Sequence, residues 1–123
     1  MKILIAEDDS MLQTAYKRMI LLVQKDAKIV LVKDGQSAID SIAEEPPDIL
    51  LLDLILPKVN GFEILKRLNE SQEIKKIKVY VITNLPANEN KERAMKLGAK
   101  DFFVKSNISV DTIKNLIVTK GER

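Results

Sequence analysis

Residues 48–61 read Asp-Ile-Leu-Leu-Leu-Asp-Leu-Ile-Leu-Pro-Lys-Val-Asn-Gly, a stretch that combines a strand, a loop and the start of a helix. The run Ile49–Leu52 is apolar without polar alternation, which is typical of a parallel strand covered on both faces. Four further runs of the same kind occur, at Ile3–Ala6, Ile29–Val32, Val79–Ile82 and Phe102–Val104. The stretch therefore predicts one of five strands in a parallel sheet.

Amphipathic segments with helical spacing separate these runs. The first follows Ser10 and Gln13, whose spacing is that of a capping box, and its apolar stripe is predicted to be Leu12, Ala15, Met19, Leu22 and Val23. The other helices are predicted to begin at or just after Asp34, Asn60, Pro86 and Ser109. The fourth of the five ends at Gly98, because glycine is the usual residue after a helix C-cap.

Strands and helices thus alternate five times, without internal repeats or a linker. Such alternation gives a parallel sheet with helices on both faces, and right-handed crossovers make it doubly wound. The expected fold class is α/β, a flavodoxin-like doubly wound (βα)5 sandwich with a five-stranded parallel sheet in the order 2-1-3-4-5. Residues 1–123 are expected to form one domain, with residues 120–123 as a tail or the start of a linker.

The composition limits the chemistry that this chain can perform. It contains no Cys and no His, which excludes disulfides, thiolate or imidazole metal ligands and a catalytic histidine. The net charge of +2 is too balanced to favour nucleic acid, so no direct nucleic-acid binding is expected. The first apolar run is too short for a signal-peptide core or a membrane span, and a cytoplasmic location is expected.

Acidic residues stand where two neighbouring strands end. The first apolar run stops at Glu7 and Asp8, and the third stops at Asp53. Ligands in this fold bind beyond the carboxyl ends of the strands, and strands one and three are adjacent in the expected order. Three converging carboxylates repel one another, so either one of them stays protonated or a metal ion joins them. Oxygen ligands alone select Mg²⁺ or Mn²⁺ over zinc or copper.

A hydroxyl and an ammonium group are expected opposite the acids. The fourth and fifth runs stop at Thr83 and Lys105, and both side chains can contact phosphoryl oxygens. The first strand–helix loop carries acids where a nucleotide site would need glycines, which excludes a nucleotide-phosphate cradle. Acids, a metal, a hydroxyl and a lysine around Asp53 indicate a site at which a carboxylate is phosphorylated.

The chain resembles, over essentially its full length, the receiver domain of bacterial two-component response regulators of the chemotaxis-regulator type. The resemblance rests on the acidic pair after strand one and on Asp53, with Pro57 four residues further on and Gly61 eight residues further on. It also rests on Thr83, thirty residues past Asp53, and on Lys105, twenty-two residues past Thr83. All of these residues stand at the expected strand ends and in the expected order. A single receiver domain over residues 1–123 is what the resemblance implies.

The resemblance implies a role for each acidic residue of the site. Asp53 would be the phosphoacceptor. Asp8 would bind Mg²⁺ directly, Glu7 would act through water, and the backbone carbonyl of Ile55 would complete the protein's share of the coordination. In the same register, Asp9 is expected in the first turn of the following helix.

The resemblance also implies a switch. Lys105 would pair with the phosphoryl group, Thr83 would hydrogen-bond it, and the ring of Phe102 would move inward when Thr83 does. The alternative for Phe102 is an ordinary core side chain. The face formed by the fourth helix, the fifth strand and the fifth helix would then present the signal to a downstream effector, because a dianionic group favours one loop arrangement over another.

The partners follow from the same resemblance and from the missing histidine. Because the chain has no His, the phosphoryl donor must be another molecule. In this family the donor is a sensor histidine kinase, a phosphotransfer protein or a small acyl phosphate. The domain would be a regulatory module and not an enzyme, since it would promote only its own phosphorylation and dephosphorylation. A phosphorylation-dependent dimer is a further possibility.

Two positions depart from the family pattern. Ser106 replaces the Pro that commonly follows the lysine, and Asn84 replaces the Ala or Gly that follows Thr83. They keep open a second class, a pseudo-receiver that binds partners without phosphotransfer. A metal-dependent phosphatase with an aspartate nucleophile is disfavoured, because Ile55 stands where that class needs a second acid. Our hypothesis is that the apolar Ile55 and Leu85 exclude water and prolong the phospho-aspartate.

Overall fold

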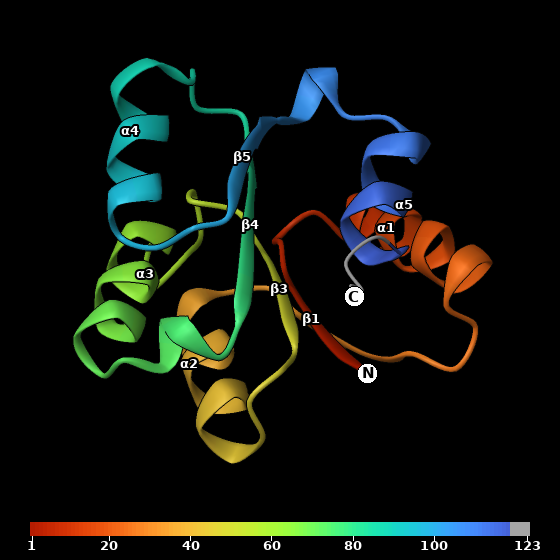
Figure 1. The fold of residues 1–123 in the computed structure, drawn as a ribbon, viewed down its shortest axis with the longest axis horizontal. Helices are drawn as coiled ribbons and strands as arrows, with labels where there is room; N and C mark the ends of the chain where they lie inside the picture. Colours follow the sequence, from red (N-terminus) through yellow and green to blue (C-terminus); the bar gives the residue numbers. More distant parts are fainter. Residues whose placement is uncertain (119–123) are drawn as a thin grey trace.

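Five parallel strands form the middle layer of the computed structural model, which describes residues 1–118 (Figure 1). Their order is β2-β1-β3-β4-β5, and every pairing between neighbours is parallel, so the predicted fold class and strand order are confirmed. The strands are β1 (Lys2–Ala6), β2 (Lys28–Val32), β3 (Ile49–Leu52), β4 (Lys78–Thr83) and β5 (Asp101–Val104).

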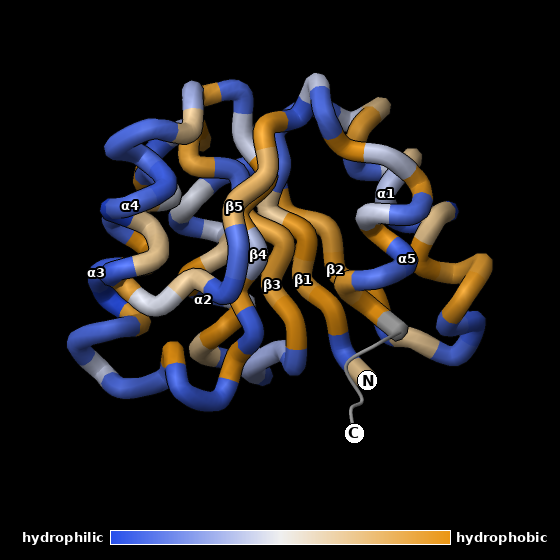
Figure 2. Tube along the Cα trace, turned by 45° about the horizontal axis from the view of Figure 1, so that its top comes forward, coloured by the Kyte–Doolittle hydropathy of each residue, from blue (hydrophilic) through white to orange (hydrophobic). Residues whose placement is uncertain are grey.

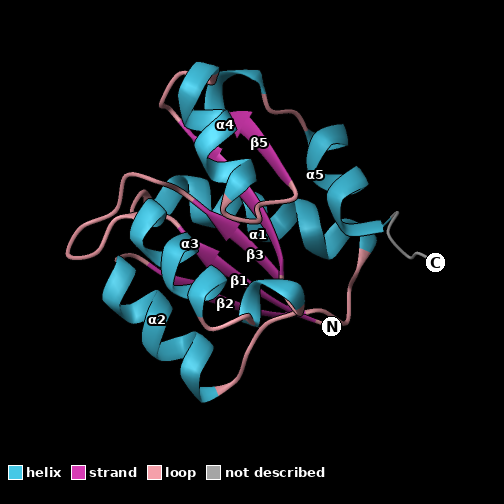
Figure 3. Ribbon diagram, turned by 60° about the vertical axis from the view of Figure 1, so that its left-hand side comes forward, coloured by secondary structure: helices cyan, strands magenta, loops and turns pink. Residues whose placement is uncertain are grey.

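Helices cover both faces of the sheet (Figures 1 and 3). They are α1 (Ser10–Val23), α2 (Gly35–Glu44), α3 (Gly61–Glu70), α4 (Asn88–Lys96) and α5 (Val110–Val118). Helices α1 and α5 lie on one face, and α2, α3 and α4 lie on the other. Two short 3-10 helices were not predicted, η1 (Glu73–Lys75) and η2 (Lys105–Asn107). No helix in residues 1–118 has the length and apolar character that a membrane crossing requires.

Most predicted helix ends are confirmed by their caps. The side chains of Asp34 and Asn60 accept hydrogen bonds from the third residue beyond each of them, at the starts of α2 and α3. Gly98 follows α4 with φ +113°, a conformation that glycine adopts without strain. Ser109 and the Thr112 side chain cap the start of α5 reciprocally. The predicted tail or linker, residues 120–123, lies outside the described residues.

The start of α1 corrects two predictions. Asp9 is the N-cap and not a first-turn residue, since its side chain accepts from the backbone N–H groups of Met11 and Leu12 at 2.8 and 3.2 Å. The predicted capping box of Ser10 and Gln13 is therefore wrong. A carboxylate suits this position because it accepts two N–H groups and also complements the positive end of the helix dipole.

The buried stripe of α1 also differs from the prediction. Gln13, Tyr16 and Ile20 are buried, whereas Leu22 is 77 % exposed. Gln13 tolerates burial because its side-chain amide donates to the backbone oxygen of Val32 over 2.8 Å. A polar residue thus takes a core position that the hydropathy pattern assigns to apolar neighbours. The other residues of the predicted stripe are half-buried, namely Leu12, Ala15, Met19 and Val23.

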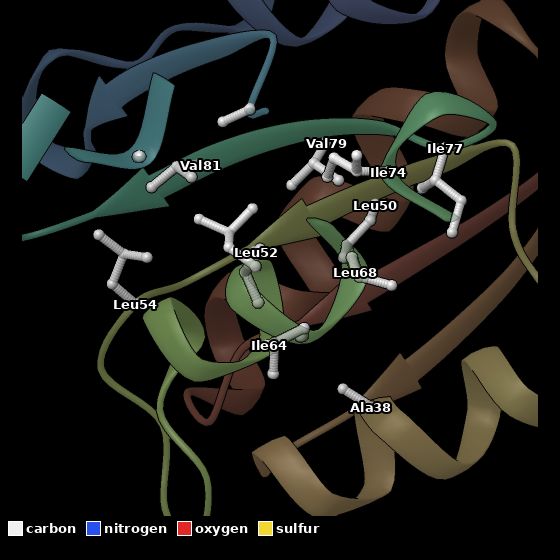
Figure 4. Packing of buried hydrophobic residues seen from close by; sticks show 14 of the residues in the cluster. Ala38, Leu50, Leu52, Leu54, Ile64, Leu68, Ile74, Ile77, Val79 and Val81 are labelled. Atoms are coloured by element: carbon white, nitrogen blue, oxygen red, sulfur yellow. The ribbon is translucent and has the colours of Figure 1, made fainter. Parts of the chain in front are cut away.

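The strands separate two apolar layers, because successive side chains of a strand point to opposite faces. In β3, Leu50 and Leu52 pack with residues of α2, α3 and α4, whereas Ile49 and Leu51 pack with residues of α1 and α5. Figure 2 shows β1, β2 and β3 as largely apolar segments, and Figure 4 shows part of the layer under α2, α3 and α4. Truncating one such fully buried Leu to Ala costs about 2–5 kcal/mol, so these layers contribute strongly to the stability of the sheet.

The ladder continues one residue beyond β1 and β3. The N–H group of Asp53 donates to the oxygen of Ala6 over 3.0 Å, and that of Glu7 donates to the oxygen of Val32 over 3.1 Å. The alternation of side chains therefore extends to both acids, which follow the residues packed against α1 and α5. Two carboxylates thus leave neighbouring strands on the same side of the sheet.

Candidate functional site

Three carboxylates meet at the carboxyl edge of the sheet, as the sequence predicts. One oxygen from each of Glu7, Asp8 and Asp53 lies within 4.8 Å of the others. Glu7 and Asp53 are only 2 % and 4 % exposed, whereas Asp8 is exposed to solvent. Two buried acids and one exposed acid therefore form a single cluster of oxygen ligands that opens to solvent on the Asp8 side.

Lys105 bridges the two buried acids. Its Nζ lies 2.8 Å from Glu7 Oε1 and 2.8 Å from Asp53 Oδ2. The peptide bond to Ser106 is trans, and the lysine, at the start of η2, still reaches the acids. The ammonium of the lysine thus supplies part of the positive charge that the cluster requires.

The electrostatics of this bridge differ between its two ends. Burial favours the neutral form of Lys105, but the hydrogen bonds with Asp53 and Glu7 and the charges of both acids outweigh it and raise the pKa of the lysine. For Glu7 the effect of burial is the larger one, and it raises the pKa of this carboxyl group. The hydrogen bonds that Lys105 and the N–H group of Asp9 donate to Glu7 act in the opposite direction. The lysine is therefore held charged, while the charge of Glu7 is held against a desolvation penalty.

The two oxygens of Asp53 have different partners. Oδ1 accepts the backbone N–H of Ile55 over 3.0 Å, and Oδ2 accepts from Lys105. The loop is held in place at Gly61, whose N–H donates to the oxygen of Leu54 over 2.9 Å. A Cβ on Gly61 would lie 2.6 Å from the backbone oxygen of Asp53, so a glycine is needed for α3 to start this close to the site.

Thr83 and Phe102 lie on the other side of the sheet. Thr83 is fully buried at the end of β4, and the N–H of Leu85 donates to its Oγ1 over 3.4 Å. Phe102 is buried in the layer under α2, α3 and α4. Within residues 1–118, no hydrogen bond joins the Thr83 side chain to Asp53 or Lys105.

The positions around the site are exposed to different degrees. The side chain of Ile55 is 52 % exposed, and Leu85 is half-buried. Asn84, at the start of the loop after β4, is exposed.

Tyr16 is not among the predicted site residues, although it is buried on the side of the sheet that carries Glu7 and Asp53. The hydropathy pattern does not indicate it, because the buried stripe that joins it to Gln13 is seen only in the structure.

The sequence matches the response regulator receiver domain over residues 3–117. The chain belongs to this family. Receiver domains are regulatory, they bind Mg²⁺ through an acidic cluster, and they interact with histidine kinases and effector domains. The oxygen donors of Glu7, Asp8 and Asp53, with no nitrogen or sulfur among them, fit such an ion.

Individual receiver proteins show the same relationship. Response regulator RR06 of Streptococcus pneumoniae is 28 % identical over 116 residues, which cover 94 % of this chain and 51 % of that protein. The chain thus spans about half the length of this relative. The signal receiver domain of a DNA-binding response regulator from Colwellia psychrerythraea 34H superposes with a TM-score of 0.84 at 28 % identity, covering 96 % of this chain and 98 % of that one. The Mn²⁺-bound response regulator Rcp1 gives a TM-score of 0.74 at 26 % identity, covering 94 % and 88 %.

Proposed function

We propose that this receiver domain is a phosphoacceptor that takes a phosphoryl group onto Asp53 from an external phosphohistidine, in a reaction that depends on Mg²⁺. The observation that carries the proposal is the pair of 2.8 Å contacts from Lys105 Nζ to Asp53 Oδ2 and to Glu7 Oε1. A buried carboxylate beside a lysine and two further acids has the charges needed to bind a phosphoryl group together with a divalent cation.

The oxygen that accepts the group is Oδ2 of Asp53. Oδ1 is occupied by the N–H group of Ile55, which orients the carboxylate, whereas the partner of Oδ2 is the flexible side chain of Lys105. Oδ2 forms a bond to phosphorus as the phosphorus–nitrogen bond of the donor breaks, and the bonding electrons leave with the imidazole. Lys105 then turns from Oδ2 to a phosphoryl oxygen, where its charge offsets that of the incoming group.

The acid cluster is the proposed place of the metal ion. Glu7, Asp8, Asp53 and the backbone carbonyl of Ile55 would hold Mg²⁺, which when bound neutralises charge on phosphoryl oxygens. Mn²⁺ is the proposed substitute, supported by the Mn²⁺-bound form of the similar protein Rcp1. The protein contributes a rigid β1–β3 edge, so the carboxylates are already close together before any ligand arrives.

Thr83 and Phe102 are the proposed switch. Thr83 lies at the end of β4 with a weakly engaged hydroxyl, because the hydrogen bond that it accepts from the Leu85 N–H is 3.4 Å long. We infer that this hydroxyl turns to a phosphoryl oxygen and that the ring of Phe102 follows. The α4-β5-α5 face then changes and is recognised by an effector, as the response regulators among the relatives suggest. A phosphorylation-dependent dimer through this face is part of the same proposal.

Incubation with acetyl phosphate and Mg²⁺, followed by intact-mass measurement, tests this function. The wild type is expected to gain one phosphoryl group and Asp53→Asn to gain none. Asp48→Asn is the matched control, because Asp48 is an acid that precedes the same strand at the opposite edge of the sheet. Equal labelling of the wild type and Asp53→Asn, or no labelling of the wild type, would overturn the proposal. The second result would favour a scaffold that binds partners without phosphotransfer.

A further inference from the structure

Tyr16 carries a buried hydroxyl that has no hydrogen-bond partner among residues 1–118. The residue is 3 % exposed, and its Oη is the one buried side-chain nitrogen or oxygen without a hydrogen-bond partner in residues 1–118. Buried polar groups are almost always paired, so an unpaired hydroxyl needs a reason.

The hydroxyl lies on the side of the sheet from which the site is built. Tyr16 packs in the layer between the sheet and α1 and α5, with residues of β1 and β3 that alternate with the site acids. Glu7 and Asp53 continue that alternation at the strand ends, and Lys105 comes two residues after Phe103, which packs against the same layer. Tyr16 therefore lies in the layer whose strands carry the two buried acids at their carboxyl ends.

The charges of the cluster act on the phenol. Burial, and then the charge of Glu7, raise the pKa of Tyr16 to about 12, and Asp53 contributes in the same direction against Lys105. The hydroxyl therefore keeps its proton under ordinary conditions and is available as a hydrogen-bond donor. Among the ionised groups that act on Tyr16, Glu7 has the largest effect.

Glu7 needs a second donor if Lys105 moves. Its Oε2 accepts the N–H of Asp9 over 3.0 Å, and its Oε1 depends on Lys105. When the lysine turns to a phosphoryl oxygen, Oε1 of a residue that is 2 % exposed loses that partner. A buried carboxylate oxygen without a donor is unfavourable, just as a buried hydroxyl without an acceptor is.

We propose that the Tyr16 hydroxyl donates a hydrogen bond to Glu7 when Lys105 leaves that carboxylate for the phosphoryl group, so that Tyr16 is a positioning residue for Glu7. The inference rests on the proposed phosphoacceptor function. Rotation of the hydroxyl lets Tyr16 take the place of Lys105 at Glu7, and the new hydrogen bond keeps that carboxylate oriented while the lysine is engaged elsewhere. Tyr16 thus stabilises the phosphorylated arrangement and not the resting one.

Tyr16→Phe tests the functional consequence, because it removes only an oxygen that has no partner in the resting state. The unfolding midpoint is expected to stay the same or rise, while phosphorylation by acetyl phosphate with Mg²⁺ slows by about tenfold, the effect of one lost hydrogen bond to a charged group. The matched control is Tyr80→Phe, which alters the other tyrosine of the same layer and is expected to leave the rate unchanged. Equal rates for wild type and Tyr16→Phe overturn the proposal, as does equal slowing in both variants.

A spectroscopic measurement tests the hydrogen bond without phosphorylation. The chain has no Trp and two Tyr, so its near-ultraviolet absorbance reports chiefly on the tyrosines. Lys105→Met frees Glu7 from the lysine, and the Tyr16 absorbance is expected to shift to the red as its hydroxyl donates to the carboxylate. The same substitution in a Tyr16→Phe background gives the contribution of Tyr80, which is expected to show no shift.

The two measurements separate the possible failures. An absent red shift in Lys105→Met overturns the Tyr16–Glu7 bond, whether or not the wild type accepts a phosphoryl group. A red shift in Lys105→Met, together with a wild type that takes up no phosphoryl group, supports the bond and overturns the proposed function. If Lys105→Met does not fold, beryllofluoride with Mg²⁺ replaces the substitution, and a red shift in the wild type that is absent from Tyr16→Phe is the expected result.

Discussion

The two edges of the sheet carry similar ion pairs in opposite settings. At the amino edge, Glu45 Oε1 binds Lys2 Nζ at 3.2 Å and Lys28 Nζ at 2.8 Å, and Glu45 and Lys28 are largely exposed. At the carboxyl edge, Lys105 Nζ binds two carboxylates at 2.8 Å, and all three side chains are at most 13 % exposed. The number and length of the contacts are alike, but water screens only the first set.

The balance of charge also differs between the edges. At the amino edge two lysines share one carboxylate, and the carboxylate of Asp48 accepts the N–H of Lys2. At the carboxyl edge three acids share one lysine within the described residues. An excess of buried negative charge is costly unless a cation binds, so the unbalanced edge is the one at which we propose that the protein functions.

The largest effect on stability is expected from Lys105→Met. It leaves two buried carboxylates without their shared counter-charge, and breaking such a buried pair costs about 3–5 kcal/mol. Because a divalent cation can take over the neutralisation, added Mg²⁺ should restore much of the loss. Chemical denaturation with and without Mg²⁺ measures both effects. A loss that Mg²⁺ leaves unchanged would mean that the acid cluster does not bind the ion.

Glu7→Gln is expected to weaken Mg²⁺ binding without destabilising the metal-free protein. The substitution removes a charge that burial opposes and that repels Asp53, so the unfolding midpoint without metal should stay the same or rise. The Mg²⁺ dissociation constant should increase by about tenfold, as for other losses of an indirect ligand. Titration calorimetry gives the constant. An unchanged constant would remove Glu7 from the metal site.

The two edges should respond to pH with opposite signs. The pKa of Glu7 is raised by burial, so its contribution to the free energy of unfolding increases as the pH falls through that raised value and levels off below about 4.5. The pKa of Glu45 is lowered by its hydrogen bonds with Lys28 and Lys2, so its contribution is present above 4.5 and is lost as the pH falls through the lowered value. Metal-free unfolding curves of wild type, Glu7→Gln and Glu45→Gln from pH 3 to 8 give both signs by difference. Equal signs would contradict the account.

The smallest effects are expected from Lys28→Met. Its partner Glu45 is exposed and keeps a second lysine, so the unfolding midpoint and the rate of phosphorylation should match those of the wild type. Thermal unfolding and the acetyl phosphate assay check this. A loss comparable to that of Lys105→Met would show that burial is not what distinguishes the two edges.

The sequence predicts the strand order and the convergence of Glu7, Asp8 and Asp53, because apolar runs without alternation identify buried parallel strands and the carboxyl ends of such strands meet. It also predicts Lys105 at this edge. It does not predict how far the lysine reaches, since the backbone after it depends on a loop in which Ser106 stands where the family commonly has Pro.

The errors are concentrated in α1. A hydropathy pattern assigns core positions to apolar residues and therefore omits Gln13, which is buried because its amide finds a backbone acceptor. The same error hides Tyr16, which lies one turn further along the stripe. Which polar groups lack a partner depends on the packing of the whole layer, and a sequence pattern does not contain that information.

The most direct test of the central claim is to locate the phosphoryl group. The wild type is treated with acetyl phosphate in Mg²⁺ or in excess chelator, and fragment masses identify the modified residue. We expect one phosphoryl group on Asp53 in Mg²⁺ and almost none in chelator. The reason is that the acid cluster is expected to need a divalent cation before it admits a further anion. Modification at another residue, or equal modification of Asp53 without Mg²⁺, would contradict this expectation.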